Sequence, residues 1–318
     1  MPSVPPALRR NSGGLCAAVV PPAPWRCGGV PGAVLCTGMS LSIRAAIQQA
    51  AVTLESSGVA SPFFDAQTLA AAQLGCARGE LLFRGPEDFP PQALAAFEQA
   101  VRRRAAREPL QHILGTAPFG ELELQVGPGG FIPRPETELL AQWATATLEK
   151  LPAPVVVDLC TGSGALAALL AHRFPGARII AVEQSEAAAR YARANLPDSV
   201  QLRIGDATEL GCVKDLCGSV DVVVSNPPYV PEGTATDVET SFDPHEAVFS
   251  GTEGMDVITR LVPVAHALLR SGGALGVEHD SGTAALVTAR LREHGGFRGI
   301  ETHQDFTHRD RFVTASKV

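Results

Sequence analysis

Short runs of apolar and β-branched residues alternate with Ala-rich helical stretches over residues 155–224, and this alternation restricts the fold more than any other feature of the chain. Four runs have the length and composition of buried strands, at residues 155–159, 178–182, 200–204 and 221–224. Strands that alternate with helices form parallel sheets with helices packed on both faces. The pattern therefore predicts an α/β fold with a doubly wound parallel sheet.

The composition excludes several classes of protein. The 318 residues carry a net charge of −7, so nucleic acid is not expected as a direct partner. No apolar stretch approaches the length of a membrane span, and we expect no membrane association. The seven cysteines are odd in number and do not have the spacing of metal ligands. They indicate reduced thiols in a cytoplasmic protein, with neither a disulfide framework nor a metal site.

The chain divides into segments of different character. Residues 1–38 contain seven prolines and six glycines without apolar periodicity, which predicts a disordered extension. Residues 39–115 are rich in Ala, with apolar residues at helical spacing, and predict a small helical bundle. The sheet domain is expected to occupy residues 134–318.

Residues 116–133 are predicted to form a β-hairpin linker between the bundle and the sheet domain. Residues 119–126 alternate between apolar and polar in the manner of a strand. The glycine-rich stretch at 127–130 has the composition of a turn and leads into a second apolar piece at 131–132.

The predicted bundle carries one cluster of basic residues, formed by Arg102, Arg103, Arg104 and Arg107. Such a run usually lies on a solvated helix face. The other interpretation is a docking surface for an acidic or RNA-bound partner.

A glycine-rich turn follows the first predicted strand and leads into a helix. Its residues are Cys160, Thr161, Gly162, Ser163 and Gly164. Glycines at such a turn let the backbone approach a ligand, and the helix N-terminus offers free N–H groups. The turn therefore predicts a cofactor loop.

Acidic residues end the next two predicted strands. Glu183 ends the second strand, where its carboxylate would accept hydrogen bonds from both hydroxyls of a ribose. Asp206, followed by Ala207, comes after the third strand, where an Asp can reach the edge of an adenine. The positions of these residues predict a nucleoside-containing cofactor.

The fourth predicted strand stops abruptly at Asn226-Pro227-Pro228-Tyr229. Two successive prolines fix φ and donate no backbone N–H, so the chain leaves the sheet in a stiff, extended turn. This turn would present a carboxamide, a backbone carbonyl and an aromatic ring at the carboxyl edge of the sheet. Ligands bind at that edge in open α/β sheets.

Residues 162–167 also satisfy the dinucleotide pattern G-x-G-x-x-G/A, so NAD is an alternative cofactor. A single match of this kind is a weak signal. The glycine-rich loop, the two acidic strand ends and the Asn-Pro-Pro-Tyr turn occur together and in order, which favours an S-adenosylmethionine-dependent methyltransferase.

Taken together, the motifs resemble those of the protein-(glutamine-N5) methyltransferases that modify peptide chain release factors. The resemblance covers residues 40–318 and rests on five stretches, at 108–115, 131–138, 158–164, 226–229 and 243–247. It implies a seven-stranded Rossmann-like class I methyltransferase domain, a helical substrate-recognition domain at 39–115 and S-adenosylmethionine as methyl donor. Cys160 departs from the pattern, because many such enzymes have glycine there.

The resemblance also implies roles for individual residues. The side-chain oxygen of Asn226 and the carbonyl oxygen of Pro227 would accept hydrogen bonds from the two N–H groups of the glutamine amide. Tyr229 would pack against the plane of this amide. Catalysis would then be mostly positioning and electrostatic preorganisation. These three residues and Pro228 make up the expected substrate-binding turn. The expected cofactor contacts are Cys160, Thr161, Gly162, Ser163, Gly164, Glu183, Asp206, Ala207 and Asn226.

The expected partner is a release factor, bound by a monomeric enzyme. One alternative substrate is a glutamine of a ribosomal protein. Another is adenine N6 of nucleic acid, because adenine-N6 DNA methyltransferases share the Asn-Pro-Pro-Tyr motif; the acidic charge and the lack of a target-recognition domain oppose it. A non-catalytic adaptor that keeps the cofactor fold is a third possibility, opposed by the presence of Asn226 and Glu183.

Overall fold

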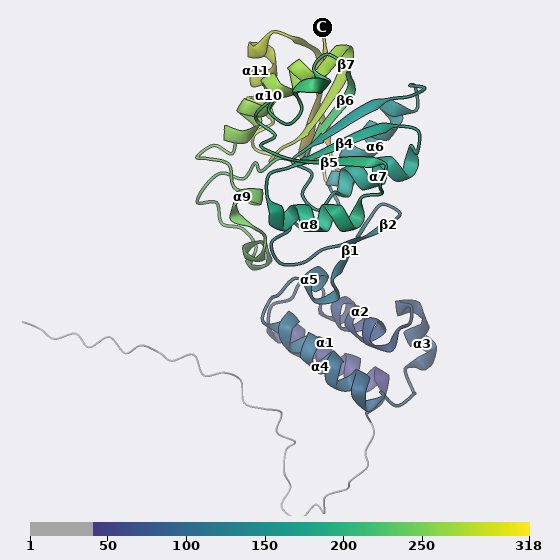
Figure 1. Ribbon diagram of the computed structural model, residues 1–318. Coiled ribbons are helices and arrows are strands. Elements are labelled where there is room, and N and C mark those ends of the chain that lie inside the picture. The colour runs from purple at the N-terminus through teal and green to yellow at the C-terminus, as the bar shows by residue number, and fades with distance from the viewer. Residues whose placement is uncertain (1–40) are drawn as a thin grey trace, which may run out of the picture. The chain divides into compact units, whose positions relative to one another are not determined.

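The structure, a computed structural model, describes residues 41–318 (Figure 1). The predicted disorder of residues 1–38 lies outside the described residues. In chain order the elements are α1 (Ile43–Ser56), α2 (Pro62–Leu74), η1 (Arg78–Glu80), α3 (Leu81–Arg84), α4 (Pro91–Ala105), α5 (Leu110–Leu114), β1 (Thr116–Phe119), β2 (Leu122–Gln125), α6 (Thr137–Leu148), β3 (Val155–Leu159), α7 (Ala165–Arg173), β4 (Arg178–Glu183), α8 (Glu186–Asn195), β5 (Val200–Ile204), η2 (Lys214–Leu216), β6 (Val220–Ser225), η3 (Val238–Phe242), α9 (His245–Val248), α10 (Asp256–Leu268), β7 (Leu269–Glu278), α11 (Ala284–His294), β8 (Phe297–Gln304) and β9 (Asp310–Lys317).

Seven strands form one sheet in the order β5-β4-β3-β6-β7-β9-β8. Strands β3 to β7 are parallel, and β9 is antiparallel to both β7 and β8. The chain builds outward from β3 through β4 to β5 and then returns to the other side of β3 for β6 and β7. The predicted seven-stranded, doubly wound α/β fold is confirmed, and its switch point lies between β3 and β6, where such sheets bind ligands.

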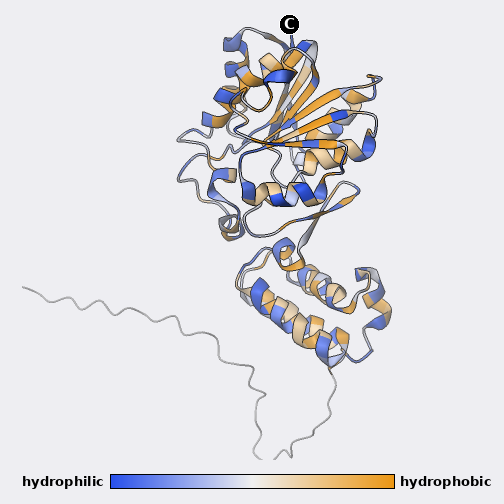
Figure 2. Ribbon diagram, in the orientation of Figure 1, coloured by the Kyte–Doolittle hydropathy of each residue, from blue (hydrophilic) through white to orange (hydrophobic). Residues whose placement is uncertain are grey.

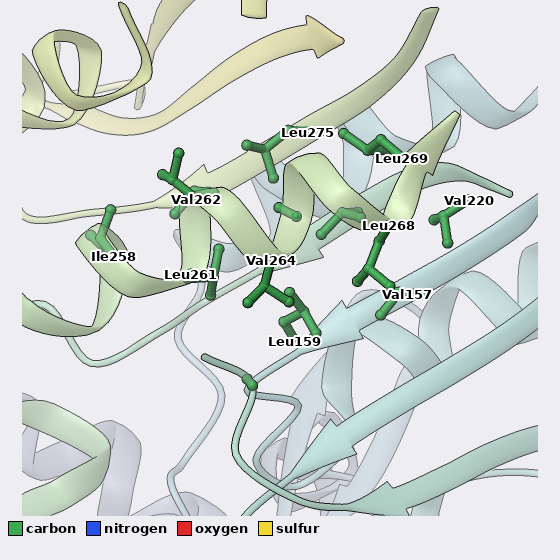
Figure 3. Close-up of a cluster of buried hydrophobic side chains, with 14 of the residues drawn as sticks. Val157, Leu159, Val220, Ile258, Leu261, Val262, Val264, Leu268, Leu269 and Leu275 are labelled. Atoms are coloured by element: carbon green, nitrogen blue, oxygen red, sulfur yellow. The ribbon is translucent and has the colours of Figure 1, made fainter. Parts of the chain in front are cut away.

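Helices cover both faces of the sheet because successive strand residues point to opposite faces (Figure 1). Val157 and Leu159 of β3 pack with Leu261 and Leu268 of α10 in one buried cluster (Figure 3). Val156 belongs to a second cluster, which it shares with apolar residues of α6 and α7. Full burial of a Val or Leu side chain contributes about 1.5–3 kcal/mol, so these two clusters hold the strand ends in place.

The predicted helices at residues 39–115 appear as α1 to α5 with the short turn η1, and they enclose an apolar core of their own. Ile43, Leu54, Leu69 and Phe97 are buried in it. In Figure 2 these helices carry hydrophobic and hydrophilic residues side by side, whereas the strands of the central sheet are largely hydrophobic. The difference arises because each of these helices buries one face, whereas the central strands are covered on both faces.

The hairpin after α5 differs from the prediction. Strands β1 and β2 pair in a register that leaves residues 120–121 as the hairpin turn. Residues 127–130 do form a turn, in which the N–H of Gly130 donates to the carbonyl of Gly127 at 3.1 Å, but it follows the hairpin and does not close it. Gly120 has φ of +56°, which a two-residue hairpin turn favours at glycine. Residues 131–132 form no strand. The glycine-rich stretch packs instead against the ring of Tyr191, where a Cβ on Gly130 would lie 2.7 Å from the ring.

The basic cluster at 102–107 is divided: Arg102 and Arg103 are exposed, as expected of a solvated helix face, whereas Arg104 and Arg107 are not. Arg104 is only 4% exposed and donates from Nε to Asp65 Oδ2 at 2.7 Å and from Nη2 to Glu239 Oε1 at 2.7 Å. Arg107 pairs with Glu239 as well. These two arginines are therefore used inside the protein, where they join α4 to η3, while Arg103 remains exposed.

Residues 41–318 include no helix that is both long enough and apolar enough to cross a membrane.

Candidate active site

A cavity of about 800 Å³ lies where the carboxyl ends of β3, β4, β5 and β6 meet. Its volume is within the usual range for sites that bind small molecules. Eleven of the residues expected at the site line it: Cys160, Thr161, Gly162, Ser163, Glu183, Asp206, Ala207, Asn226, Pro227, Pro228 and Tyr229. Gly164 does not line the cavity; it precedes α7 and packs against Leu196.

Asp158, near the end of β3, organises the glycine-rich loop. Its Oδ2 accepts hydrogen bonds from Thr161 Oγ1 at 2.5 Å and from the backbone N–H of Ala167 at 3.2 Å. Burial raises the pKa of Asp158 to about 7, against the effect of these two donors. Asp158 lines the cavity, and within residues 41–318 its Oδ1 finds no hydrogen-bond partner.

The loop turns through left-handed backbone at three positions. Gly162 and Gly164 have φ of +60° and +89°, which glycine adopts without strain. Cys160 has φ of +62°, where a side chain costs about 1–2 kcal/mol. With Cys160 in place of a glycine the loop therefore keeps the same left-handed backbone, but at a cost in conformational energy. Burial raises the pKa of the Cys160 thiol, so it stays protonated and is no nucleophile.

Glu183 ties the loop to the end of β4. Its Oε2 accepts from the backbone N–H of Gly162 at 2.8 Å, and its Oε1 accepts from that of Ser185 at 2.8 Å. The side chain is buried, which raises its pKa, and the backbone donors act in the opposite direction. Each carboxylate oxygen can accept a second hydrogen bond, so Glu183 keeps capacity for two hydroxyl donors.

Asp206, after β5, is held by its own turn. Its Oδ1 accepts from the backbone N–H of Thr208 at 2.8 Å and from Thr208 Oγ1 at 2.7 Å. Burial acts to raise the pKa of Asp206, but the Thr208 hydrogen bonds and the nearby Arg260 outweigh it and leave the pKa lowered. Asp206 is therefore an ionised acceptor at the cavity wall.

The Asn-Pro-Pro-Tyr turn also lines the cavity. Asn226 Nδ2 donates to Thr137 Oγ1 at 3.1 Å, and the Tyr229 hydroxyl donates to Glu278 Oε1 at 2.9 Å. Burial first, and then the neighbouring Glu278, raises the pKa of Tyr229, so the phenol is neutral. The ring of Tyr229 and the carboxamide of Asn226 are thus both anchored to side chains from other elements.

The two anchoring residues, Thr137 and Glu278, were not among the predicted site residues. Thr137 stands in the stretch 131–138, which contributes to the family resemblance, and Glu278 ends β7. A polar residue at the end of a parallel strand is the signal that pointed to Glu183 and Asp206. The same signal could have indicated Glu278.

Other polar residues reach the cavity from segments without a recognisable motif, among them Arg309 and Arg311 from the β8–β9 region. Arg134 also lines the cavity and forms an ion pair with the buried Asp243. Asp243 Oδ1 accepts from the backbone N–H of Ile132 at 3.3 Å as well. Two stretches that carry the family resemblance, 131–138 and 243–247, are therefore joined at the edge of the site.

Comparisons with known proteins match both parts of the chain. Residues 45–115 match the family described as PrmC N-terminal domain, and residues 136–242 match the methyltransferase small domain. A release factor glutamine methyltransferase of Corynebacterium glutamicum is 49% identical over 282 residues, covering 87% of this chain and 100% of that protein. One of Mycobacterium tuberculosis is 42% identical over 285 residues, covering 87% of this chain and 92% of that protein.

Among solved structures, the Mtq2–Trm112 complex of E. cuniculi, responsible for methylation of the eRF1 translation termination factor, matches with a TM-score of 0.42 and 22% identity. The match covers 59% of this chain and 99% of that chain.

Proposed function

We propose, since the chain belongs to the release factor glutamine methyltransferase family, that it methylates the side-chain amide N5 of a glutamine in a peptide chain release factor. The methyl donor is S-adenosylmethionine. The observation that carries the proposal is the juxtaposition, in one cavity, of a nucleoside-type pocket and the anchored Asn226 carboxamide.

The residues present fit this donor. When bound, S-adenosylmethionine supplies an electrophilic methyl group on a positively charged sulfonium. We assign the ribose to Glu183, whose two oxygens each keep a free acceptor position, and the adenine to Asp206. Asp158, whose Oδ1 finds no hydrogen-bond partner within residues 41–318, lines the same cavity. The ionised Asp206, in a cavity also lined by the carboxyl groups of Asp158 and Glu183, favours a positively charged ligand.

The Asn-Pro-Pro-Tyr turn would act on the glutamine. An amide nitrogen is a weak nucleophile because its lone pair is delocalised into the carbonyl. Acceptors on both of its N–H bonds, the Asn226 Oδ1 and the Pro227 carbonyl oxygen, orient the nitrogen and favour the pyramidal geometry of attack. The neutral ring of Tyr229 holds the amide plane. No dedicated base is needed, because the nitrogen becomes strongly acidic as it gains the methyl group.

The substrate is tested directly by incubating the protein with labelled S-adenosylmethionine and, separately, with purified release factor, ribosomal proteins and DNA. We expect label only in the release factor, at a single glutamine, and no label when that glutamine is replaced by alanine. Label in a ribosomal protein or in DNA, with none in the release factor, would overturn the assignment.

We further propose that the protein acts as a monomer in the cytoplasm and without direct contact with nucleic acid. The net charge of −7 supports the last point, because nucleic-acid binding requires a basic surface. Light scattering of the purified protein should give the mass of one chain. A shift of the protein on a native gel with RNA or DNA at physiological salt would contradict the proposal.

The helical domain, residues 39–115, is our candidate for recognition of the release factor. Large apolar side chains are exposed on α2 and α3, with Phe63 at 52%, Leu82 at 72% and Phe83 at 84% exposure. Phe83→Ser should raise the KM for release factor about fivefold, on the order of 1 kcal/mol for an interface aromatic, with an unchanged Kd for S-adenosylmethionine. An unchanged KM would exclude Phe83 from the interface, and Val52→Ser, at 63% exposure on α1, is the control.

Glu183→Ala should weaken S-adenosylmethionine binding by about 1.5–3 kcal/mol, the range for hydrogen bonds to a charged group. Two effects combine, since the ribose acceptors are lost and the anchor of the Gly162 N–H is lost with them. Calorimetry measures the change. Because the folded-state pKa of Glu183 is raised, the parental affinity should also fall as the pH drops through that raised value. Parental affinity in the alanine variant would show that Glu183 only ends the strand.

A further inference from the structure

Two buried residues hold both functional side chains of the Asn-Pro-Pro-Tyr turn. Thr137 begins α6 and is 3% exposed, while Glu278 ends β7 and is 2% exposed. Thr137 Oγ1 accepts from Asn226 Nδ2 at 3.1 Å, and Glu278 Oε1 accepts from the Tyr229 hydroxyl at 2.9 Å. Three elements distant in sequence therefore meet at the cavity, which Thr137, Asn226 and Tyr229 line.

The direction of this network follows from its donors and acceptors. A hydroxyl has one proton to donate, and Thr137 already accepts from Asn226 on its oxygen. Its own proton is then available to a further acceptor, and the Thr137 hydroxyl is one of the hydrogen-bond donors that act on Glu278. Burial raises the pKa of Glu278 to about 7, and the hydroxyls of Thr137 and Tyr229 act against that rise. In the described chain the other carboxylate oxygen, Oε2, has no hydrogen-bond partner.

With a pKa of about 7, Glu278 is ionised above neutral pH, and there it acts as an acceptor. Glu136 acts to raise its pKa and Arg311 to lower it, and these two side chains lie 3.4 Å apart as an ion pair of their own. An ionised carboxylate can only accept hydrogen bonds, so the chain of donors runs one way, from Asn226 through Thr137 to Glu278. Tyr229 joins it from the other side.

We propose that Thr137 and Glu278 are positioning residues that determine which end of the Asn226 carboxamide faces the substrate. The inference rests on the proposed function. With Nδ2 held by Thr137, the Oδ1 atom is left to accept an N–H of the glutamine. A carboxamide rotated by 180° would direct Nδ2–H at that N–H, so two donors would meet and the hydrogen bond would be lost.

The test compares two replacements of Thr137 that differ in one group. Valine has nearly the shape of threonine but lacks the hydroxyl, so Asn226 loses the partner that sets its orientation. Serine keeps the hydroxyl. At pH 8, where Glu278 is ionised, Thr137→Val should lower kcat for release factor between about 10- and 100-fold. Thr137→Ser should stay within about threefold of the parent, and the Kd for S-adenosylmethionine should be unchanged in both.

Glu278→Gln tests the direction of the network at almost constant shape. Its Oε1 can still accept from Tyr229, but its NH₂ group then competes for the Thr137 oxygen and turns the Thr137 proton toward Asn226. We expect a loss of kcat similar to that of Thr137→Val. Because both variants release the same carboxamide, the double variant Thr137→Val/Glu278→Gln should be little worse than either single one.

The outcomes separate the two ideas. A parent protein that leaves the release factor unlabelled would overturn the proposed function. A parent that is active, together with a Thr137→Val variant at parental kcat, would overturn the positioning role alone. Equal losses in the valine and serine variants, or additive losses in the double variant, would also overturn it, because they would point to general damage at the helix start.

Discussion

Asn226→Ala should lower kcat for release factor by about 10²–10³, with the Kd for S-adenosylmethionine nearly unchanged. Loss of one preorganised group at a reacting centre typically has this effect, about 2.7–4 kcal/mol of transition-state stabilisation. Asn226 lines the cavity and is anchored through Nδ2, so the lost atom is the acceptor that faces the reacting amide. Single-turnover kinetics and calorimetry measure the two quantities separately.

Asn226→Asp is the informative control. The carboxylate can still accept one hydrogen bond, so it should retain part of the rate. It cannot donate to Thr137, however, and places two acceptors together there. Its kcat should therefore fall between those of the parent and of the alanine variant. Methylation by Asn226→Ala at close to the parental rate would mean that the Asn-Pro-Pro-Tyr turn is a scaffold without a chemical role.

Arg104→Ala should destabilise the protein by about 3 kcal/mol, because it leaves the buried carboxylate of Asp65 without a partner. Asp65 is 5% exposed and receives the Nε hydrogen bond of Arg104 at 2.7 Å. The change also removes the hydrogen bond to Glu239. Urea denaturation measures the loss. The folded-state pKa of Asp65, already raised by burial, should rise further, so the difference from the parent should shrink as the pH falls and Asp65 takes up a proton.

Two controls give this prediction its meaning. Arg103→Ala removes an exposed arginine whose pair with Glu108 contributes at most about 1 kcal/mol. The double variant Asp65→Asn/Arg104→Met removes both charges and should lose less than Arg104→Ala alone, because no unpaired charge stays buried. Equal stability of Arg103→Ala and Arg104→Ala would show that the buried pair is not a determinant of stability.

The parts of the site that the sequence predicted are those where a local pattern determines position. A strand followed by Gly162 and Gly164 fixes a turn, and Glu183 and Asp206 follow strands whose ends must share one edge of the sheet. Parallel strands with helical connections therefore bring Gly162, Glu183 and Asp206 to one cavity. Their roles toward cofactor and substrate stay predictions, which the variants above test.

The parts that the sequence did not predict depend on contacts between distant segments. Thr137 meets Asn226 across 89 positions of the chain, and no local pattern announces the pairing. The burial of Arg104 was not predicted for the same reason, since its partner Glu239 lies 135 residues further along the chain. The hairpin failed differently. The glycine-rich stretch at 127–130 has a stronger turn composition than residues 120–121 and does turn, but outside the hairpin, where its glycines allow close packing against Tyr191.

The position of β9 has a consequence for biosynthesis. This strand, Asp310–Lys317, lies between β7 and β8 and pairs Phe312 with Glu278. Until residues 310–317 have left the ribosome, β7 keeps an unpaired edge and β8 has no neighbour in the sheet. Cofactor loop, helical bundle and Asn-Pro-Pro-Tyr turn are all synthesised earlier. Nascent chains must therefore hold an incomplete sheet, exposed to chaperones and proteases, until residues 310–317 have been translated.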